Sequence, residues 1–350
     1  MSVVENFTEL RVREAASLDE ENENDARLLR ALIQELADFQ GLSDGPRVGA
    51  DQLQRHLKNG AATALIATAT KGGGQNCEKL EEVGEKEMVV GYAVYFVCPS
   101  VQFGKVFFLE DLYLRPDFRR HKFGSQMMQK LSEYARTSRS DAFLWNAHSS
   151  NKGAILFYNS LGAKELTADV VPKMNCWSIL PAEYEKIVQT YKGSLPDIKL
   201  TVLDNVHLNE KAAVKLAEDW CRLCDNASPA PNAEKKALLQ AVRVGGFRVI
   251  QAQNLYGTVL GIALFHHCAF STWNGPYITI DRLRVHAEHR GKGIGKKLVA
   301  ELFSIAAELN CPKIRWTAHA DASTDALFTS FGATNLTEKE GCLLFQLKLN

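Results

Sequence analysis

Two loops rich in arginine and lysine are the segments whose residue types and spacing most clearly suggest chemistry. Their sequences are Arg119-Arg120-His121-Lys122-Phe123-Gly124-Ser125 and Arg290-Gly291-Lys292-Gly293-Ile294-Gly295-Lys296, and each follows a strand-like segment and leads into a helical pattern. The start of a helix presents unpaired backbone N–H groups and about half a positive charge, which suits a pyrophosphate. Glycine lets the backbone approach a phosphate closely, and arginine or lysine adds charge-assisted hydrogen bonds. The loops therefore predict two phosphate-binding sites, the alternative being two ordinary turns.

The second loop matches the spacing R-x-x-G-x-G completely, whereas the first has Lys122 where the first glycine belongs. The second loop is neither a P-loop, because it lacks G-K-[ST] at the right spacing, nor a dinucleotide-binding G-x-G-x-x-G near the first strand. Its place after a strand and before a long amphipathic helix favours a phosphate site over a turn. The first loop keeps N–H groups and positive charge, but Lys122 predicts a poorer fit to a pyrophosphate.

The two loops belong to an internal repeat. Segment 109–114 (LEDLYL) aligns with segment 280–285 (IDRLRV) at an offset of 171 residues, and the same offset relates the two loops. The triplet 161–163 (LGA) matches 331–333 (FGA) at an offset of 170 residues. Three blocks in the same order and at nearly the same spacing indicate a duplication.

The chain is therefore expected to hold two domains, residues 1–192 and 197–350. The boundary falls near Tyr191–Asp197, where Gly193, Ser194 and Pro196 are typical of a linker. Near the start of the repeat the offset is larger, and the excess is about the length of 71–87. That stretch is rich first in glycine and then in glutamate and lysine, which predicts an exposed inserted loop.

Hydrophobic periodicity predicts the same order of elements in both halves, and that order fits a mixed sheet of the α+β class. In the first half we expect helices at 26–39, 124–136, 154–161 and 181–191, the last closing that half, and strands at 9–13, 62–68, 88–97, 105–114 and 142–147. In the second half we expect helices at 211–224, 234–242, 294–309 and around Ala326, and strands at 247–253, 259–268, 277–285 and 313–318.

Composition narrows the classes of function. The 41 basic and 41 acidic residues give a net charge of zero, and no basic run supports binding to nucleic acid or to a membrane surface. The N-terminus lacks the features of a secretory signal, so the eight cysteines are expected to be reduced thiols in the cytoplasm. Cys221 and Cys224 form a C-x-x-C inside a helical pattern without a second pair, so no metal is expected.

Several blocks resemble the GNAT superfamily of N-acetyltransferases, and within it the diamine (spermidine/spermine) and thialysine acetyltransferases. In the first half these blocks are 109–114, the loop from Arg119, the segment 156–163 (LFYNSLGA), and the helix 29–39 followed by 42–44 (LSD). In the second half they are 271–275 (STWNG), the intact loop 290–295 and 332–341 (GATNLTEKEG). The resemblance covers most of the chain and implies two tandem GNAT domains.

The resemblance also implies an activity. Acetyl-CoA would serve as cosubstrate, and its acetyl group would pass directly, in a ternary complex, to a primary amine of a small molecule such as a polyamine or a thialysine-like compound. Glu110 would act through water as the general base, Tyr158 would protonate the departing CoA thiolate, and Glu110 and Asp111 would bind the amine. An amine with a pKa of about 10 must lose a proton before it attacks a thioester, and a phenol stabilises a thiolate.

Residues that would contact acetyl-CoA follow from the same resemblance. In the first half they are Leu112, Leu114, Arg119, Arg120, Lys122, Gly124, Ser125 and Asn151. In the second half they are Leu283, Val285, Arg290, Gly291, Gly293, Gly295 and Lys296.

The two halves depart from the family pattern in different ways. Phe328 stands at the position of Tyr158, Asp281 at that of Glu110, and Arg282 at that of Asp111. In the first half, Gln40 stands where diamine enzymes place a carboxylate that binds the amine. We therefore expect the first half to be catalytic and the second to bind CoA with little or no activity.

Several alternatives stay open. The chain could bind CoA without turnover, as a pseudoenzyme or sensor; the second half could be the active one; or the acceptor could be an amine of a protein. We expect a small-molecule amine as the partner, with no nucleic acid and no membrane. The protein would be either a monomer whose two domains pack as a pseudo-dimer or a homodimer.

Overall fold

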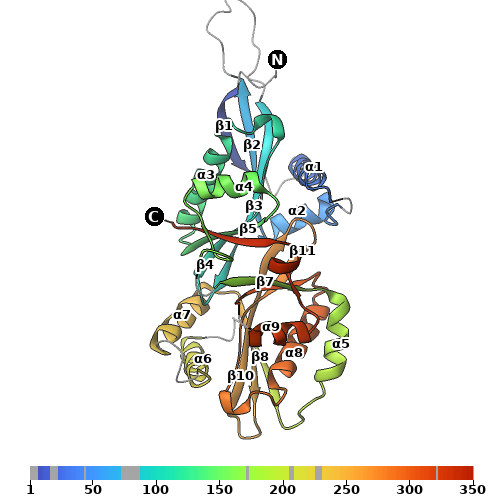
Figure 1. Ribbon diagram of the computed structural model, residues 1–350, viewed down its shortest axis with the longest axis vertical. Helices are drawn as coiled ribbons and strands as arrows, with labels where there is room; N and C mark the ends of the chain where they lie inside the picture. Colours follow the sequence, from blue (N-terminus) through green and yellow to red (C-terminus); the bar gives the residue numbers. More distant parts are fainter. Residues whose placement is uncertain are drawn as a thin grey trace, which may run out of the picture.

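The computed structural model describes residues 7–15, 23–42, 45–71, 87–170, 173–204, 209–224, 231–320 and 322–349. The elements gather into two lobes along the long axis of the molecule, each built on one seven-stranded mixed sheet (Figure 1). The predicted α+β class is thereby confirmed. The expected inserted loop, 71–87, lies almost entirely outside the described residues. In the described part of the chain, every helix is too short or too polar to cross a membrane.

The first sheet has the strand order β1-β2-β3-β4-β5-β14-β6. Its strands are β1 (Phe7–Glu14), β2 (Thr63–Lys71), β3 (Glu87–Ser100), β4 (Gly104–Leu114), β5 (Ala142–His148), β14 (Cys342–Leu347) and β6 (Lys164–Glu165). The helices of this lobe are α1 (Glu23–Phe39), α2 (Ala50–Lys58), α3 (Phe123–Thr137) and α4 (Lys152–Ser160).

The second sheet has the strand order β13-β7-β12-β11-β10-β9-β8. Its strands are β13 (Thr334–Asn335), β7 (Met174–Ile179), β12 (Ile314–His319), β11 (Gly275–Val285), β10 (Val259–Ser271), β9 (Phe247–Gln253) and β8 (Lys199–Asp204). The helices of this lobe are α5 (Pro181–Tyr191), α6 (Glu210–Arg222), α7 (Pro231–Val244), α8 (Ile294–Glu308), α9 (Ala322–Ser330) and α10 (Leu336–Lys339).

Both faces of the first sheet are covered, because successive side chains of a strand point to opposite faces. On β3, Tyr92 and Val94 pack in the core that contains Leu29 and Leu32 of α1. The intervening Ala93 packs in the core that contains residues of α3 and α4. The near-continuous apolar sequence of β3 follows from this burial on both sides.

The sheets exchange one strand each. Strand β7 precedes the predicted boundary, yet it pairs with β12 in the second sheet, where Trp177 lies opposite Trp316. Strand β14 follows the boundary, yet it pairs with β5 in the first sheet, where Phe345 lies opposite Trp145. In Figure 1 the red C-terminal strand crosses the lobe built of blue and green elements. The predicted domain bounds, 1–192 and 197–350, stay a prediction. Each of the two sheets contains one strand that comes from the other side of the predicted boundary.

The predicted helix 181–191 forms as α5 (Pro181–Tyr191), but its expected place in the first half is wrong. Tyr184 of α5 packs against Phe303 of α8, with 5.2 Å between the ring centroids, so α5 belongs to the second lobe. An amphipathic pattern shows that a helix has one apolar face, but it does not say which sheet that face covers.

Candidate active site

A wedge opens in each sheet where two parallel strands separate. Strands β4 and β5 pair only from Val106 to Leu109, although β4 continues to Leu114. Strands β11 and β12 pair only at Ile278 and Thr279 of β11. Beyond these points, one edge of β4 and one edge of β11 have no neighbouring strand in the described part of the chain, so their backbone groups are open to a ligand.

A β-bulge lies at the start of each wedge. On the other edge of β4, Val94 pairs with Asp111 and Tyr95 with Leu109, so Glu110 is the extra residue. Strand β11 has the same irregularity at Asp281, between the paired residues Ile280 and Arg282. A bulge bends its strand and redirects the side chain that it contains. The two sheets therefore place a carboxylate at the same point of the wedge.

The first wedge leads into a groove of about 720 Å³. All the residues predicted to contact acetyl-CoA in the first half line this groove, and so does Tyr158. Other residues that line the groove were not predicted from the sequence, namely Leu36, Phe39, Tyr113, Ser150, Lys152, Gly153, Ala154 and Phe157. Glu110 and Asp111 do not line the groove; they lie at the base of the wedge, against the second half of the chain.

The first loop keeps its backbone shape without the glycines of the second. Arg120 and Lys122 have φ angles of 66° and 64°, and the equivalent Gly291 and Gly293 have 74° and 87°. A left-handed conformation costs a non-glycine residue roughly 1–2 kcal/mol. Lys122 is the N-cap of α3, so this strained backbone leads directly into the helix N-terminus at the groove. The loop thus presents the same N–H groups and adds the side chains of Arg120 and Lys122.

Two further contacts shape the groove. The Arg119 Nε donates a hydrogen bond to the Leu114 carbonyl at 2.9 Å, and its guanidinium lies 4.1 Å from the centroid of the Phe39 ring. The Asn151 side chain accepts a hydrogen bond from the Ala154 amide at 3.1 Å and caps α4. Arg119 is therefore anchored to the end of β4, and Asn151 fixes the helix that carries Tyr158.

Tyr158 is held with its ring in the core and 9% of its surface exposed. Its ring packs against Trp145 and against Phe345 of the exchanged strand, with centroids 5.1 and 5.4 Å away. Burial, reinforced by the negative charge of Asp111, raises the pKa of the Tyr158 phenol to about 12. The phenol is therefore protonated at neutral pH and is able to donate its proton.

Glu110 is half-buried where the two halves of the chain meet. Burial and the neighbouring Asp111 raise the pKa of its carboxyl to about 7. Lys313, which precedes β12, and Arg315 of β12 oppose this rise with their positive charges, and the Ser271 side chain opposes it with a hydrogen bond. A carboxyl with this pKa takes up and releases a proton near neutral pH, as a general base must.

Asp111 is engaged by hydroxyl groups from both halves. The Thr272 hydroxyl donates to its Oδ2 at 2.6 Å, and the Tyr92 hydroxyl donates to the same oxygen at 3.0 Å. Burial raises the pKa of Asp111, and these hydrogen bonds oppose the rise. The predicted contact of Asp111 with the amine stays a prediction.

Asp281 of the second half is contacted by residues of the first half, just as Glu110 and Asp111 are contacted by residues of the second half. The turn that follows β3 supplies the Val101 amide, which lies 3.2 Å from both carboxylate oxygens of Asp281, and a hydrogen bond from the Ser100 side chain. Ser271 and Thr272, at the same positions of the repeat, contact Glu110 and Asp111. Each turn therefore covers the bulge carboxylate of the other half. Sequence reasoning missed these partners because they are distant along the chain and act across the two halves.

The second groove, of about 1040 Å³, is lined by all the residues predicted for the second half and by Asp281 and Phe328. The Arg290 Nε donates to the Val285 carbonyl at 3.2 Å, as Arg119 does to Leu114. The Phe328 ring packs against Trp177 and Trp316, with centroids 5.4 and 4.9 Å away, and carries no hydroxyl. The second groove thus repeats the loop of the first but has no hydroxyl at the position of Tyr158; its phenol, that of Tyr191, comes from α5.

Comparisons with known proteins agree with this geometry. The acetyltransferase (GNAT) family model matches residues 78–163 and 211–333. The thialysine N-epsilon-acetyltransferase of Sus scrofa is 30% identical over 152 residues, which are 42% of this chain and 84% of that protein. The human spermidine/spermine N(1)-acetyltransferase-like protein 1 is 29% identical over 83 residues, 24% of this chain and 12% of that protein.

Among solved structures, a tandem GNAT protein from the clavulanic acid biosynthesis pathway matches with a TM-score of 0.54 and 16% identity. The match covers 98% of this chain and 99% of that one. At this identity the likeness shows that the two chains share a fold, including its tandem arrangement.

Proposed function

Because the chain belongs to the GNAT family of acetyltransferases, we propose that its first half transfers the acetyl group of acetyl-CoA to a primary amine of a small molecule. One observation carries the proposal. The first half combines a carboxyl with a pKa of about 7, Glu110, with a protonated phenol, Tyr158, beside a single wedge. The second half lacks this pair, because Phe328 replaces the tyrosine and the shorter Asp281, whose carboxylate accepts a hydrogen bond from the Val101 amide, replaces Glu110.

The groove of the first half suits the cosubstrate. The open edge of β4 around Leu112 and Leu114 offers backbone groups to the amides of the pantetheine arm. The N-terminus of α3, with Arg120 and Lys122 beside it, offers N–H groups and positive charge to the pyrophosphate. These residues would hold acetyl-CoA with its thioester toward the base of the wedge, near Glu110.

The proposed reaction follows from the protonation states of the two side chains. Ionised Glu110 takes a proton from the substrate ammonium, directly or through water, and leaves a neutral amine. The amine nitrogen attacks the thioester carbonyl carbon, the C–S bond breaks, and the nitrogen loses its second proton. The departing thiolate takes the proton of the Tyr158 phenol, and the second proton of the nitrogen, carried by water, restores that phenol while Glu110 releases its proton to solvent. No acyl-enzyme is needed, because the amine attacks bound acetyl-CoA itself.

Charges around Glu110 bear on the choice of amine. Lys313 and Arg315 act on the same buried region as Glu110 and Asp111, so two cations balance two carboxylates. A polycation gains little in such surroundings, whereas an amine that also carries a carboxylate finds partners for both of its charges. We therefore favour a thialysine-like amino acid over a polyamine, in line with the Sus scrofa relative.

The second groove would bind acetyl-CoA without transferring the acetyl group. Its glycine-containing loop suits a pyrophosphate, while Phe328 offers no hydroxyl at the position that Tyr158 occupies in the first half. The two halves contact each other through the turns that cover Asp281 and Glu110 and through the exchanged strands. One chain would therefore form a monomer whose two domains pack as a pseudo-dimer.

An assay of CoA thiol release tests the proposal, with thialysine, lysine, putrescine, spermidine and a lysine-containing peptide as acceptors. Glu110→Gln should lower kcat/KM by at least about a hundredfold, since a general base contributes 10²–10⁴. Asp281→Asn, at the equivalent position of the second half, should leave most of the activity. Inactivity of the wild type on every amine would favour a CoA-binding role without turnover. Loss of activity in Asp281→Asn alone would place catalysis in the second half.

A further inference from the structure

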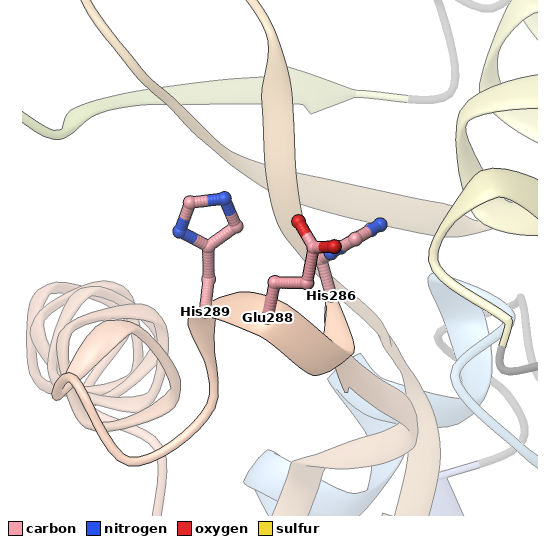
Figure 2. Close-up of side chains that lie close together, drawn as sticks. All are labelled: His286, Glu288 and His289. Carbon is pink, nitrogen blue, oxygen red and sulfur yellow. The ribbon is translucent and has the colours of Figure 1, made fainter.

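Three side chains that commonly bind metal ions converge on the turn after β11. His286 precedes the one-turn helix η4 (Ala287–His289), and Glu288 and His289 lie within it. One potential ligand atom from each of the three residues lies within 4.8 Å of the other two. Figure 2 shows the three side chains projecting to the same side of the turn. Within the described residues, no other group of three such side chains has this geometry.

The turn itself does not require these residue types. The first half builds the same turn after β4, as η2 (Pro116–Phe118), with Arg115, Asp117 and Phe118 at the corresponding positions. Its Phe118 amide donates to the Arg115 carbonyl at 3.0 Å, and the His289 amide donates to the His286 carbonyl at 2.9 Å. The backbone is thus the same in both halves, and only the second carries two imidazoles and a carboxylate there.

Two of the three side chains of the first turn are engaged in contacts within the fold, and Asp117 is exposed. Phe118 is 5% exposed and belongs to the hydrophobic core, and Arg115 forms two hydrogen bonds, of 2.9 and 2.7 Å, with the Glu35 carboxylate. In the second turn, the Nδ1 atom of His286 is buried and has no hydrogen-bond partner among the residues that the structure describes. A buried polar atom without a partner costs about 1–3 kcal/mol, so a ligand that bonds to it would be favoured.

We propose that His286, Glu288 and His289 form a binding site for a divalent transition-metal ion of the zinc class at the edge of the second groove. Two imidazoles and one carboxylate are a donor set that suits zinc and neighbouring transition metals better than magnesium or calcium. Bonds of about 2 Å require the three donors to close slightly around the ion, and rotation of the exposed Glu288 side chain supplies much of that movement.

Three protein ligands leave at least one coordination position of the ion for water or another molecule. His289 also lines the second groove, and Arg290 follows it directly. The ion therefore adds positive charge where the groove already carries Arg290. The expectation that the chain binds no metal concerns the isolated C-x-x-C of Cys221 and Cys224, which lies apart from the closely spaced H-x-E-H of this turn.

Zinc titration of the full-length, chelator-treated protein tests the site, with calorimetry as the readout and a reducing agent present. The matched protein is the triple variant His286→Ala, Glu288→Gln and His289→Ala. The wild type should bind one zinc ion more per chain than the triple variant, whatever binding the thiols contribute to both. His289→Ala alone should weaken that site at least tenfold.

His319→Ala is the control, because His319 is an exposed histidine of the same groove that lies outside the cluster. It should bind zinc as the wild type does. The visible absorption of bound Co²⁺ should change between the wild type and the triple variant, since it reports the ligands of the ion. Equal zinc stoichiometry in these two proteins, or an equal loss of affinity in His319→Ala and His289→Ala, would overturn the proposal.

Discussion

Replacement of Lys313 by methionine should move the pH dependence of acetyl transfer upward. Lys313 immediately precedes β12, with its ammonium 4.8 Å from the centroid of the Tyr277 ring, and its positive charge favours the ionised form of Glu110. Burial, together with the charge of Arg315, lowers the pKa of Lys313 itself to about 8. At pH 7 Lys313 is therefore still mostly protonated, so its charge is present in the range where Glu110 titrates.

The size of the shift follows from the charges around Glu110. Its pKa is raised from 4.5 to about 7. The protein therefore destabilises the ionised form of Glu110, relative to the protonated form, by about 3 kcal/mol. A nearby opposite charge changes a pKa by roughly 1–3 units, and Arg315 remains in the variant, so we expect an upward shift of about one unit. At pH 7 the ionised fraction of Glu110 would then fall from about one half to about one tenth.

The assay is kcat/KM as a function of pH, because this ratio reports the ionisations of the free enzyme and substrate. With the same amine, Lys313→Met should be about fivefold slower than the wild type at pH 7 and should match it at pH 9. Lys130→Met, on the exposed side of α3, should leave the profile unchanged. A midpoint that stays in place or moves downward in Lys313→Met would refute the assignment of Glu110 as the base.

Three further predictions concern the loop, the thiols and the exchanged strands. Lys122→Gly should raise the free energy of unfolding by up to about 1 kcal/mol in urea denaturation, because it relieves a left-handed φ of 64°; a loss of stability would contradict the strain. A hydrogen bond with Cys176 and the charge of Arg315 lower the pKa of the Cys342 thiol to about 7. Its alkylation by iodoacetamide should therefore reach half its maximal rate near pH 7, and a midpoint near 9 would contradict this; Cys342→Ser should remove that phase. Residues 1–192 produced alone lack β14, so circular dichroism and gel filtration should show a poorly folded or aggregated product, whereas a stable monomer would show that the exchanged strand is dispensable.

Much of the site could be predicted from local sequence. The two arginine-rich loops and the start of the following helices depend on neighbouring residues, and the predicted cofactor residues of each half line one groove each. In the first loop, Lys122 has a positive φ of 64°. Glycine is the usual residue at a positive φ, yet the loop keeps its backbone with lysine there, because the surrounding strand and helix determine its path.

Features that depend on pairing between distant segments could not be predicted. Strands β7 and β14 are both short and apolar, so their own sequences do not determine which sheet each strand joins. The bulge at Glu110 arises from its register with β3, which the sequence of β4 alone does not contain. The contacts of Ser271 with Glu110 and of Thr272 with Asp111 exist only because the two halves meet at these turns.

The central claim is that acetyl transfer takes place in the first half, with Tyr158 as the proton donor to the thiolate. The most direct test is kcat for acetyl transfer by Tyr158→Phe, a change that removes one hydroxyl and keeps the packing of the ring against Trp145 and Phe345. We predict a fall in kcat of about 10²–10⁴, typical of the loss of a general acid, with acetyl-CoA binding retained. A kcat equal to that of the wild type would contradict the claim.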